Sequence, residues 1–132
     1  MTMTLNYFAI LAAAVVGWIA GAVWYGVFAK PWTAALGWSA DAPKSVPVGA
    51  MIASFVAELV MAALLAGLIG HFGQPGVRIG LVTGALSWLG FVAPTMAVNY
   101  AFQKRPIKLT VIDSGHWLVV LLAMGTVIGL FG

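Results

Sequence analysis

The sequence predicts an all-α integral membrane protein, a bundle of four transmembrane helices with one short interfacial helix after the first span. Of its residues, 63% are hydrophobic and only 7% are charged, proportions that soluble globular domains do not reach. Its uncharged stretches are also long, and about 20 apolar residues in a helix cross the hydrocarbon core of a bilayer. We expect residues 1–132 to form a single transmembrane domain.

The four predicted spans cover approximately residues 5–29, 48–70, 79–101 and 109–131. The first has neither the basic segment nor the small-residue cleavage site of a signal peptide, so we expect a retained helix. After it comes "KPWTAALGW", where a proline follows Lys30 and a glycine stands at position 37. That order is typical of a short helix on the membrane surface.

The basic residues predict an orientation. Five of the six lie in the first and third connections, at Lys30, Lys44, Lys104, Arg105 and Lys108, whereas Arg78 is alone in the second. Under the positive-inside rule, the first and third connections are cytoplasmic and both termini lie outside. The scattered cations form no basic face, so we expect membrane lipid and no nucleic acid as a partner.

Aromatic residues gather near the predicted cytoplasmic boundary. Trp24, Tyr25 and Trp32 lie there, and amphipathic rings settle at the headgroup level of a bilayer. We therefore predict that these three residues form an aromatic boundary.

Small residues recur at every fourth position in the spans. The rows are Ala13, Gly17 and Gly21; Ala50, Ser54, Ala62, Ala66 and Gly70; Gly76, Gly80 and Gly84; and Gly125 and Gly129. Small side chains let helices approach closely, which favours van der Waals contact between them in lipid. We expect most rows to pack inside the bundle and the others to contact a second copy in a homo-oligomer, or a larger membrane complex.

Glu58 lies near the centre of the second span, where a carboxylate is costly unless it is neutralised, paired or hydrated. It falls on the small-residue row between Ser54 and Ala62, so it should face protein. Pro94 lacks an amide hydrogen and frees the carbonyl of Gly90. We expect a protonated Glu58 to donate to that carbonyl; a proton or cation pathway and a ligand contact are the alternatives.

Thr95, Asn99, Asp113 and His116 form a second polar group around the last connection. By helical rise, Asn99 and Asp113 lie at similar depth, with Thr95 and His116 one turn deeper. They could therefore pair across the hairpin. "TVID" also matches a capping box, in which the side chains of Thr110 and Asp113 satisfy free amides at a helix start. Helix capping with hairpin bonding and a polar mouth of a pathway both remain open.

No catalytic, cofactor or metal site is expected. Cysteine is absent, and the two histidines fall at opposite membrane faces with too few neighbouring carboxylates for a zinc or iron centre. The chain holds no serine hydrolase, zinc protease, phosphate-loop or dinucleotide motif. We therefore expect a protein that is not an enzyme.

Three segments of the chain are distinctive: "GAVWYGVFAKPWTAALG" at 21–37, "GFVAPTMAVNYAFQKRPIKL" at 90–109 and "IDSGHWLVVLLAMG" at 112–125. They resemble the blocks of the bacterial membrane family catalogued as domain of unknown function 1761. The resemblance implies four membrane spans, in a bacterial inner membrane. It points to the positions that match the family pattern, namely Trp24, Tyr25, Trp32, Asn99 and Asp113. Where the family often has Gly-Tyr, this chain has Gly115 and His116, so no catalytic role for His116 is implied.

Two functions fit these observations. In the first, the chain is a non-enzymatic packing, accessory or assembly component that acts through close helix contacts. In the second, it is a small proton- or cation-linked transporter or channel component, with Glu58 at the midplane and the second polar group as its cytoplasmic mouth. The substrate or ion of such a transporter is not indicated.

Overall fold

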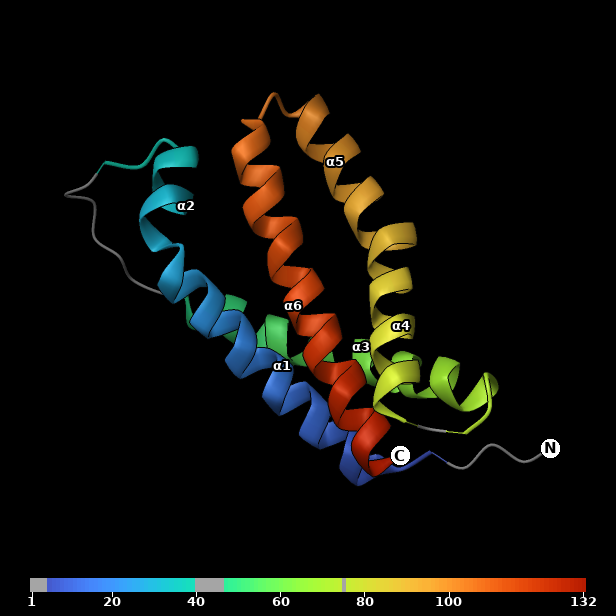
Figure 1. The fold of residues 1–132 in the computed structure, drawn as a ribbon. Coiled ribbons are helices and arrows are strands. Elements are labelled where there is room, and N and C mark those ends of the chain that lie inside the picture. Colours follow the sequence, from blue (N-terminus) through green and yellow to red (C-terminus); the bar gives the residue numbers. More distant parts are fainter. Residues whose placement is uncertain (1–4, 40–46, 75) are drawn as a thin grey trace.

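The computed structural model describes residues 5–39, 47–74 and 76–132, and within them it contains helices and no strand (Figure 1). The elements are α1 Tyr7–Val27, α2 Ala29–Ala35, α3 Val48–His71, α4 Val77–Ser87, the π-helix η1 Trp88–Val92, α5 Ala93–Phe102 and α6 Ile107–Phe131. Four helices are long and apolar enough to cross a membrane: α1, α3, the continuous helix Val77–Phe102 and α6. The predicted all-α fold class is confirmed, and it indicates a multi-pass membrane protein.

Helix α6 is the central helix of the bundle. It lies between α1 and the continuous helix α4–η1–α5, and α3 crosses the other helices obliquely (Figure 1). The most extensive contacts of α6 are with α4 and α1. The core contains the apolar side chains of Leu65, Ile69, Val120 and Met124, all at most 2% exposed. Side chains of other helices that contact α6 therefore belong to the central packing of the bundle.

Asn6 joins the beginning of α1 to the end of α6. Its Oδ1 accepts from the backbone N–H of Ala9 at 3.1 Å, which caps α1, and its Nδ2 donates to the carbonyl of Phe131 at 2.7 Å. The amide thus satisfies free backbone groups at both helix ends. One end of the α1–α6 pair is fixed in this way.

Glycines allow α4 and α6 to meet backbone to backbone. A Cβ atom on Gly80 would overlap the carbonyl of Gly125, and one on Gly125 would overlap the carbonyl of Gly80. A Cβ on Gly84 would lie 2.7 Å from the carbonyl oxygen of Leu121. This side of the bundle therefore has no room for a larger residue at the facing positions.

The third span contains a π-helical turn, η1, directly before Pro94. The N–H of Ala93 donates to the carbonyl of Trp88, five residues earlier, and the hydroxyl of Thr95 donates to the carbonyls of Phe91 and Val92 at 2.6 and 2.9 Å. Proline removes one backbone bond, and the wide turn and the threonine hydroxyl satisfy neighbouring carbonyls. The helix continues through the proline.

The predicted bond from Glu58 to the carbonyl of Gly90 is wrong. Gly90 is exposed, and a Cβ built on it would meet no atom within 4 Å. The continuous helix presents this residue to the outside because α4 and η1 turn another side toward α6. The hydrogen bond that Glu58 makes is with Ser54 on its own helix.

The predicted capping box is also wrong. Helix α6 begins at Ile107 with Pro106 as its N-cap, and no side chain caps it. Thr110 and Asp113 therefore lie inside the helix. Proline favours a helix start because its φ angle is preset and its missing N–H would have no partner there.

Of the residues used for the predicted orientation, Lys44 lies outside the described part.

Candidate functional site

Asp113 on α6 accepts hydrogen bonds from three other helices. The hydroxyl of Tyr25, on α1, donates to Oδ1 at 2.6 Å, and Nε1 of Trp32, on α2, donates to the same oxygen at 3.0 Å. The hydroxyl of Tyr100, on α5, donates to Oδ2 at 2.6 Å. Asp113 is 8% exposed. We call these four residues the aspartate clamp.

Two tryptophans extend the clamp to the backbone on either side of Asp113. Nε1 of Trp24 donates to the carbonyl of Ile112 at 3.0 Å, and Nε1 of Trp88 donates to the carbonyl of Ser114 at 2.7 Å. Each indole therefore finds a partner for its one polar atom, as buried indoles usually do. The segment of α6 around Asp113 is held from α1 on one side and from η1 on the other.

The donors around Asp113 are hydroxyl and indole groups, which are neutral. Among the described residues, no lysine or arginine forms an ion pair with this carboxyl group. An ionised carboxylate is acceptor-only and has about four lone-pair positions, and hydrogen bonds to an ionised group are stronger than those between neutral groups. Chemically, the arrangement is suited to fix the positions of four helices at this end of the bundle.

Trp24, Tyr25 and Trp32, predicted as an aromatic boundary, bond to α6 through their polar atoms. Tyr25 and Trp32 donate to Asp113 and Trp24 donates to the carbonyl of Ile112. The ring of Trp24 lies against Gly115, where a Cβ would be 2.8 Å from Cζ2 of the indole. The position of these three rings at the membrane boundary stays a prediction.

His116 lies beside the clamp, one helical turn after Asp113 on the same side of α6. Its ring centroid is 4.7 Å from that of Tyr25 and 4.6 Å from that of Trp117. The buried Nδ1 has no hydrogen-bond partner among the described residues. Tyr25 thus contacts both Asp113 and His116, which agrees with the face that the i, i+3 spacing assigns to the two residues.

Thr95 and Asn99 are not brought to the clamp. Both residues are exposed, and the hydroxyl of Thr95 is bonded to its own helix. The side chain of Asn99 forms no hydrogen bond with another described residue. The predicted pairing of these residues with Asp113 and His116 across the hairpin is therefore wrong. The reason is the rotation of α5, which turns Tyr100 toward α6 and Asn99 away from it.

Glu58 on α3 faces the bundle interior and is 1% exposed. The hydroxyl of Ser54 donates to its Oε2 at 3.3 Å, and its Oε1 has no partner among the described residues. A Cβ on Gly17 would lie 3.2 Å from Oε1 and 2.8 Å from Cγ of Met124. The carboxyl group is therefore enclosed between α1 and α6.

Sequence reasoning placed Glu58 inside the protein but missed Tyr100 and Trp88 as members of the site. The clue that could have led to them is the chemistry of Asp113, which is one of only three acidic residues in the chain. A buried carboxylate needs donors, and tyrosines and tryptophans are plentiful on both sides of it. Which of them reach it depends on helix rotation, which the sequence pattern left open.

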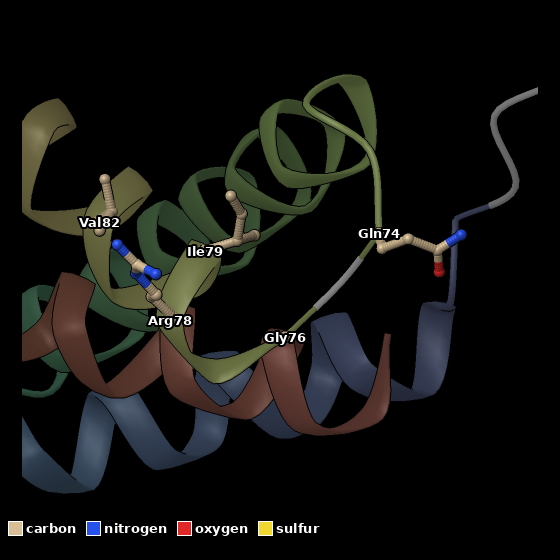
Figure 2. Close-up of a pocket in the computed structure, with 5 residues that line it drawn as sticks. All are labelled: Gln74, Gly76, Arg78, Ile79 and Val82. Carbon is tan, nitrogen blue, oxygen red and sulfur yellow. The ribbon is translucent and has the colours of Figure 1, made fainter.

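A pocket of about 460 Å³ lies at the beginning of α4 (Figure 2). It is lined by Gln74, Gly76, Arg78, Ile79 and Val82. None of the predicted site residues contributes to it. Within the described part of the chain, no three histidine or acidic residues are grouped so that they could hold a metal ion.

One family model matches residues 8–129, and its description is "Protein of unknown function (DUF1761)". The match covers all seven helical elements except the first residue of α1 and the last two residues of α6. No curated protein and no solved structure matches the chain. The resemblance that the three sequence segments indicated is confirmed.

Proposed function

The chain belongs to the family described as "Protein of unknown function (DUF1761)", and we propose that it is a non-enzymatic accessory or assembly component of a membrane, which associates with a second copy through α5. The observation that carries this proposal is the surface of α5. None of its residues is buried, although it bears the amide of Asn99 within an apolar span. Helix α5 is held to α6 by the clamp bond of Tyr100, so it offers a fixed surface.

Asn99 supports a second copy as the partner. A polar side chain within a span is stabilised by bonding to another helix. An amide carries both a donor and an acceptor, so Asn99 of one copy can pair with Asn99 of another across a two-fold axis. Thr95 and Phe102 are also exposed, and they lie one turn before and one turn after Asn99 on the same face of the helix.

Cysteine cross-linking tests this proposal directly, because the natural chain contains no cysteine. We expect Phe102→Cys in lipid bilayers to form a disulfide-linked dimer on mild oxidation, because Phe102 is 86% exposed one turn after Asn99. Ile19→Cys is the matched control, since Ile19 is 56% exposed on α1, away from the proposed interface. Asn99→Leu in the Phe102→Cys background should reduce the cross-link. Equal, low cross-linking of Phe102→Cys and Ile19→Cys would contradict the proposal.

We further propose that the Asp113 end of the bundle faces the cytoplasm of a bacterium and that both termini lie outside. Lys30, Lys104, Arg105 and Lys108 are exposed on the elements that meet at Asp113, and basic connections stay inside. A membrane-impermeant maleimide applied to intact spheroplasts should label Arg78→Cys and spare Lys104→Cys. The opposite labelling pattern would reverse the orientation.

A second candidate is a small proton- or cation-linked transporter or channel component. Glu58 of α3 is buried in the interior of the bundle, and its Oε1 has no hydrogen-bond partner among the described residues. Both observations favour this candidate. Under this candidate, Glu58→Gln should abolish a proton-coupled or cation flux in proteoliposomes. Under the assembly proposal, the same change leaves the Phe102→Cys cross-link intact. The two measurements therefore separate the candidates.

A further inference from the structure

Two enclosed polar atoms lie along one row of α1 glycines. In the described residues, the buried side-chain atoms without a hydrogen-bond partner are Oε1 of Glu58 and Nδ1 of His116. A Cβ on Gly17 would lie 3.2 Å from Oε1 of Glu58, and one on Gly21 would lie 2.6 Å from Nε2 of His116. Residues four apart in a helix are separated by roughly 6 Å along its axis. The carboxyl group and the imidazole thus occupy successive turns of the same groove.

The groove contains no cation among the groups described around Glu58. That carboxyl group is faced by Gly17 from α1, by Met124 from α6 and by Ser54 from its own helix. A carboxylate enclosed in a membrane span without a cation is strongly disfavoured relative to the neutral acid. A proton on Glu58 removes this charge. The neutral acid then has one O–H, which gives it a proton to exchange.

His116 connects this position to the clamp. Its ring is in contact with Tyr25, the residue whose hydroxyl donates to Asp113. A neutral imidazole has one N–H and one unprotonated nitrogen. The ring therefore can accept a proton on one nitrogen and release one from the other.

Val120 separates the two groups. It stands one turn after His116 and one turn before Met124 on α6, is 0% exposed, and its Cγ2 would be 3.5 Å from a Cβ on Gly21. No polar atom of Val120 can carry a proton. Direct transfer between Glu58 and His116 is therefore blocked in this conformation, and transfer requires this side chain to move and admit water.

We propose that Glu58 binds a proton in the middle of the bundle and exchanges it with the Asp113 end through His116, with Val120 as the apolar barrier between them. The proton leaves the carboxyl O–H and binds the unprotonated nitrogen of the imidazole through an intervening water. The intervening water gains the proton of Glu58 and gives one of its own protons to the imidazole. The imidazolium then releases its other N–H proton to a water molecule at the end of the bundle where Tyr25 and Asp113 lie, which leaves a neutral imidazole and the carboxylate of Glu58. This inference is independent of the assembly proposal, because it uses no residue of α5.

Infrared spectroscopy of the full chain in lipid tests the proposal. The carbonyl stretch of a protonated carboxylic acid is distinct from that of a carboxylate, and the chain has only three acidic side chains. We expect such a band near neutral pH, and we expect it to disappear in Glu58→Gln. In deuterated buffer the band shifts as the proton exchanges. His116→Phe should slow this shift by more than about tenfold, since it removes the group that relays the proton.

Matched variants distinguish a relay from a general change in packing. His71→Phe alters the other histidine, which is exposed at the end of α3, and should leave the exchange rate unchanged. Val120→Ala should speed the exchange, whereas Val127→Ala, at another buried valine of α6, should not. If His116→Phe does not fold, His116→Gln applies the same test with a polar side chain that does not titrate.

Two results would overturn the inference. One is the absence of a protonated-acid band that depends on Glu58, which would show that Glu58 holds no proton. The other is an exchange rate in the folded His116 variant equal to that of the native chain. The Phe102→Cys cross-link reports on a different helix, so either failure is distinguishable from failure of the assembly proposal.

Discussion

The hydroxyl of Tyr25 donates a 2.6 Å hydrogen bond to Oδ1 of Asp113, which lies 88 positions later in the chain. This bond joins the end of α1 to the beginning of α6 at the point where Trp32 from α2 and Tyr100 from α5 also donate. One carboxyl group therefore connects three helices to the central one.

Removing the hydroxyl of Tyr25 should weaken the fold. We expect Tyr25→Phe to lower the free energy of unfolding by about 1.5 to 3 kcal/mol, the net value of a hydrogen bond to a charged group. Unfolding in mixed micelles of increasing denaturing detergent, followed by tryptophan fluorescence, measures it. Tyr7→Phe is the control because Tyr7 is 77% exposed. Equal stability of the two variants would show that the bond contributes nothing.

Asp113 should be more sensitive than any single donor. Asp113→Ala leaves three donors without their acceptor, at a cost of about 1 to 3 kcal/mol for each one that stays buried. Asp113→Asn should be milder, since its oxygen can still accept from Tyr25 and Trp32 and its amide can donate to the hydroxyl of Tyr100. The same unfolding measurement applies. An alanine variant as stable as the asparagine variant would contradict the clamp.

The glycines between α4 and α6 should tolerate no methyl group. We expect Gly80→Ala to reduce the free energy of unfolding by about 1 to 3 kcal/mol, because the added carbon must push the helices apart. Gly67→Ala is the matched control on α3, where a Cβ would meet nothing within 4 Å. It should be neutral or stabilising, since alanine favours helix over glycine. Thermal unfolding in detergent compares them.

Lys104 occupies the turn between α5 and α6 with a φ angle of 57°, in the left-handed region that L-residues other than glycine adopt at a cost. We expect Lys104→Gly to be more stable than Lys104→Ala by about 1 kcal/mol. Both variants remove the lysine charge, so the difference between their free energies of unfolding, measured in the same way, isolates the backbone effect. Equal stabilities would indicate that the turn relaxes.

The span boundaries follow closely from the sequence, because a helix in lipid must satisfy its own backbone and needs a sufficient apolar length. The burial of Glu58 also follows from its position on a small-residue row. Its partner does not, because a row defines which face of α3 turns inward and leaves open which helix it meets. The actual neighbours are Gly17 and Met124 rather than Gly90.

The hairpin around the last connection shows the same division. The sequence indicated that polar residues gather there, but the pairing of Asn99 with Asp113 rested on depth alone. Depth counts residues along each helix and contains no information about rotation. A rotation of α5 by one residue exchanges Asn99 for Tyr100, which is the residue that meets Asp113.

By itself, the sequence determined the fold class, the four apolar helices and the family, because each depends on composition, on apolar length or on local motifs. Only the tertiary structure decided that Trp24, Tyr25 and Trp32 point inward to α6, that Asp113 is bonded by three helices, and that Glu58 and His116 share one groove on α1. These relationships depend on how helices rotate and cross when they pack. Such rotations are set by contacts between distant residues, which no local pattern contains.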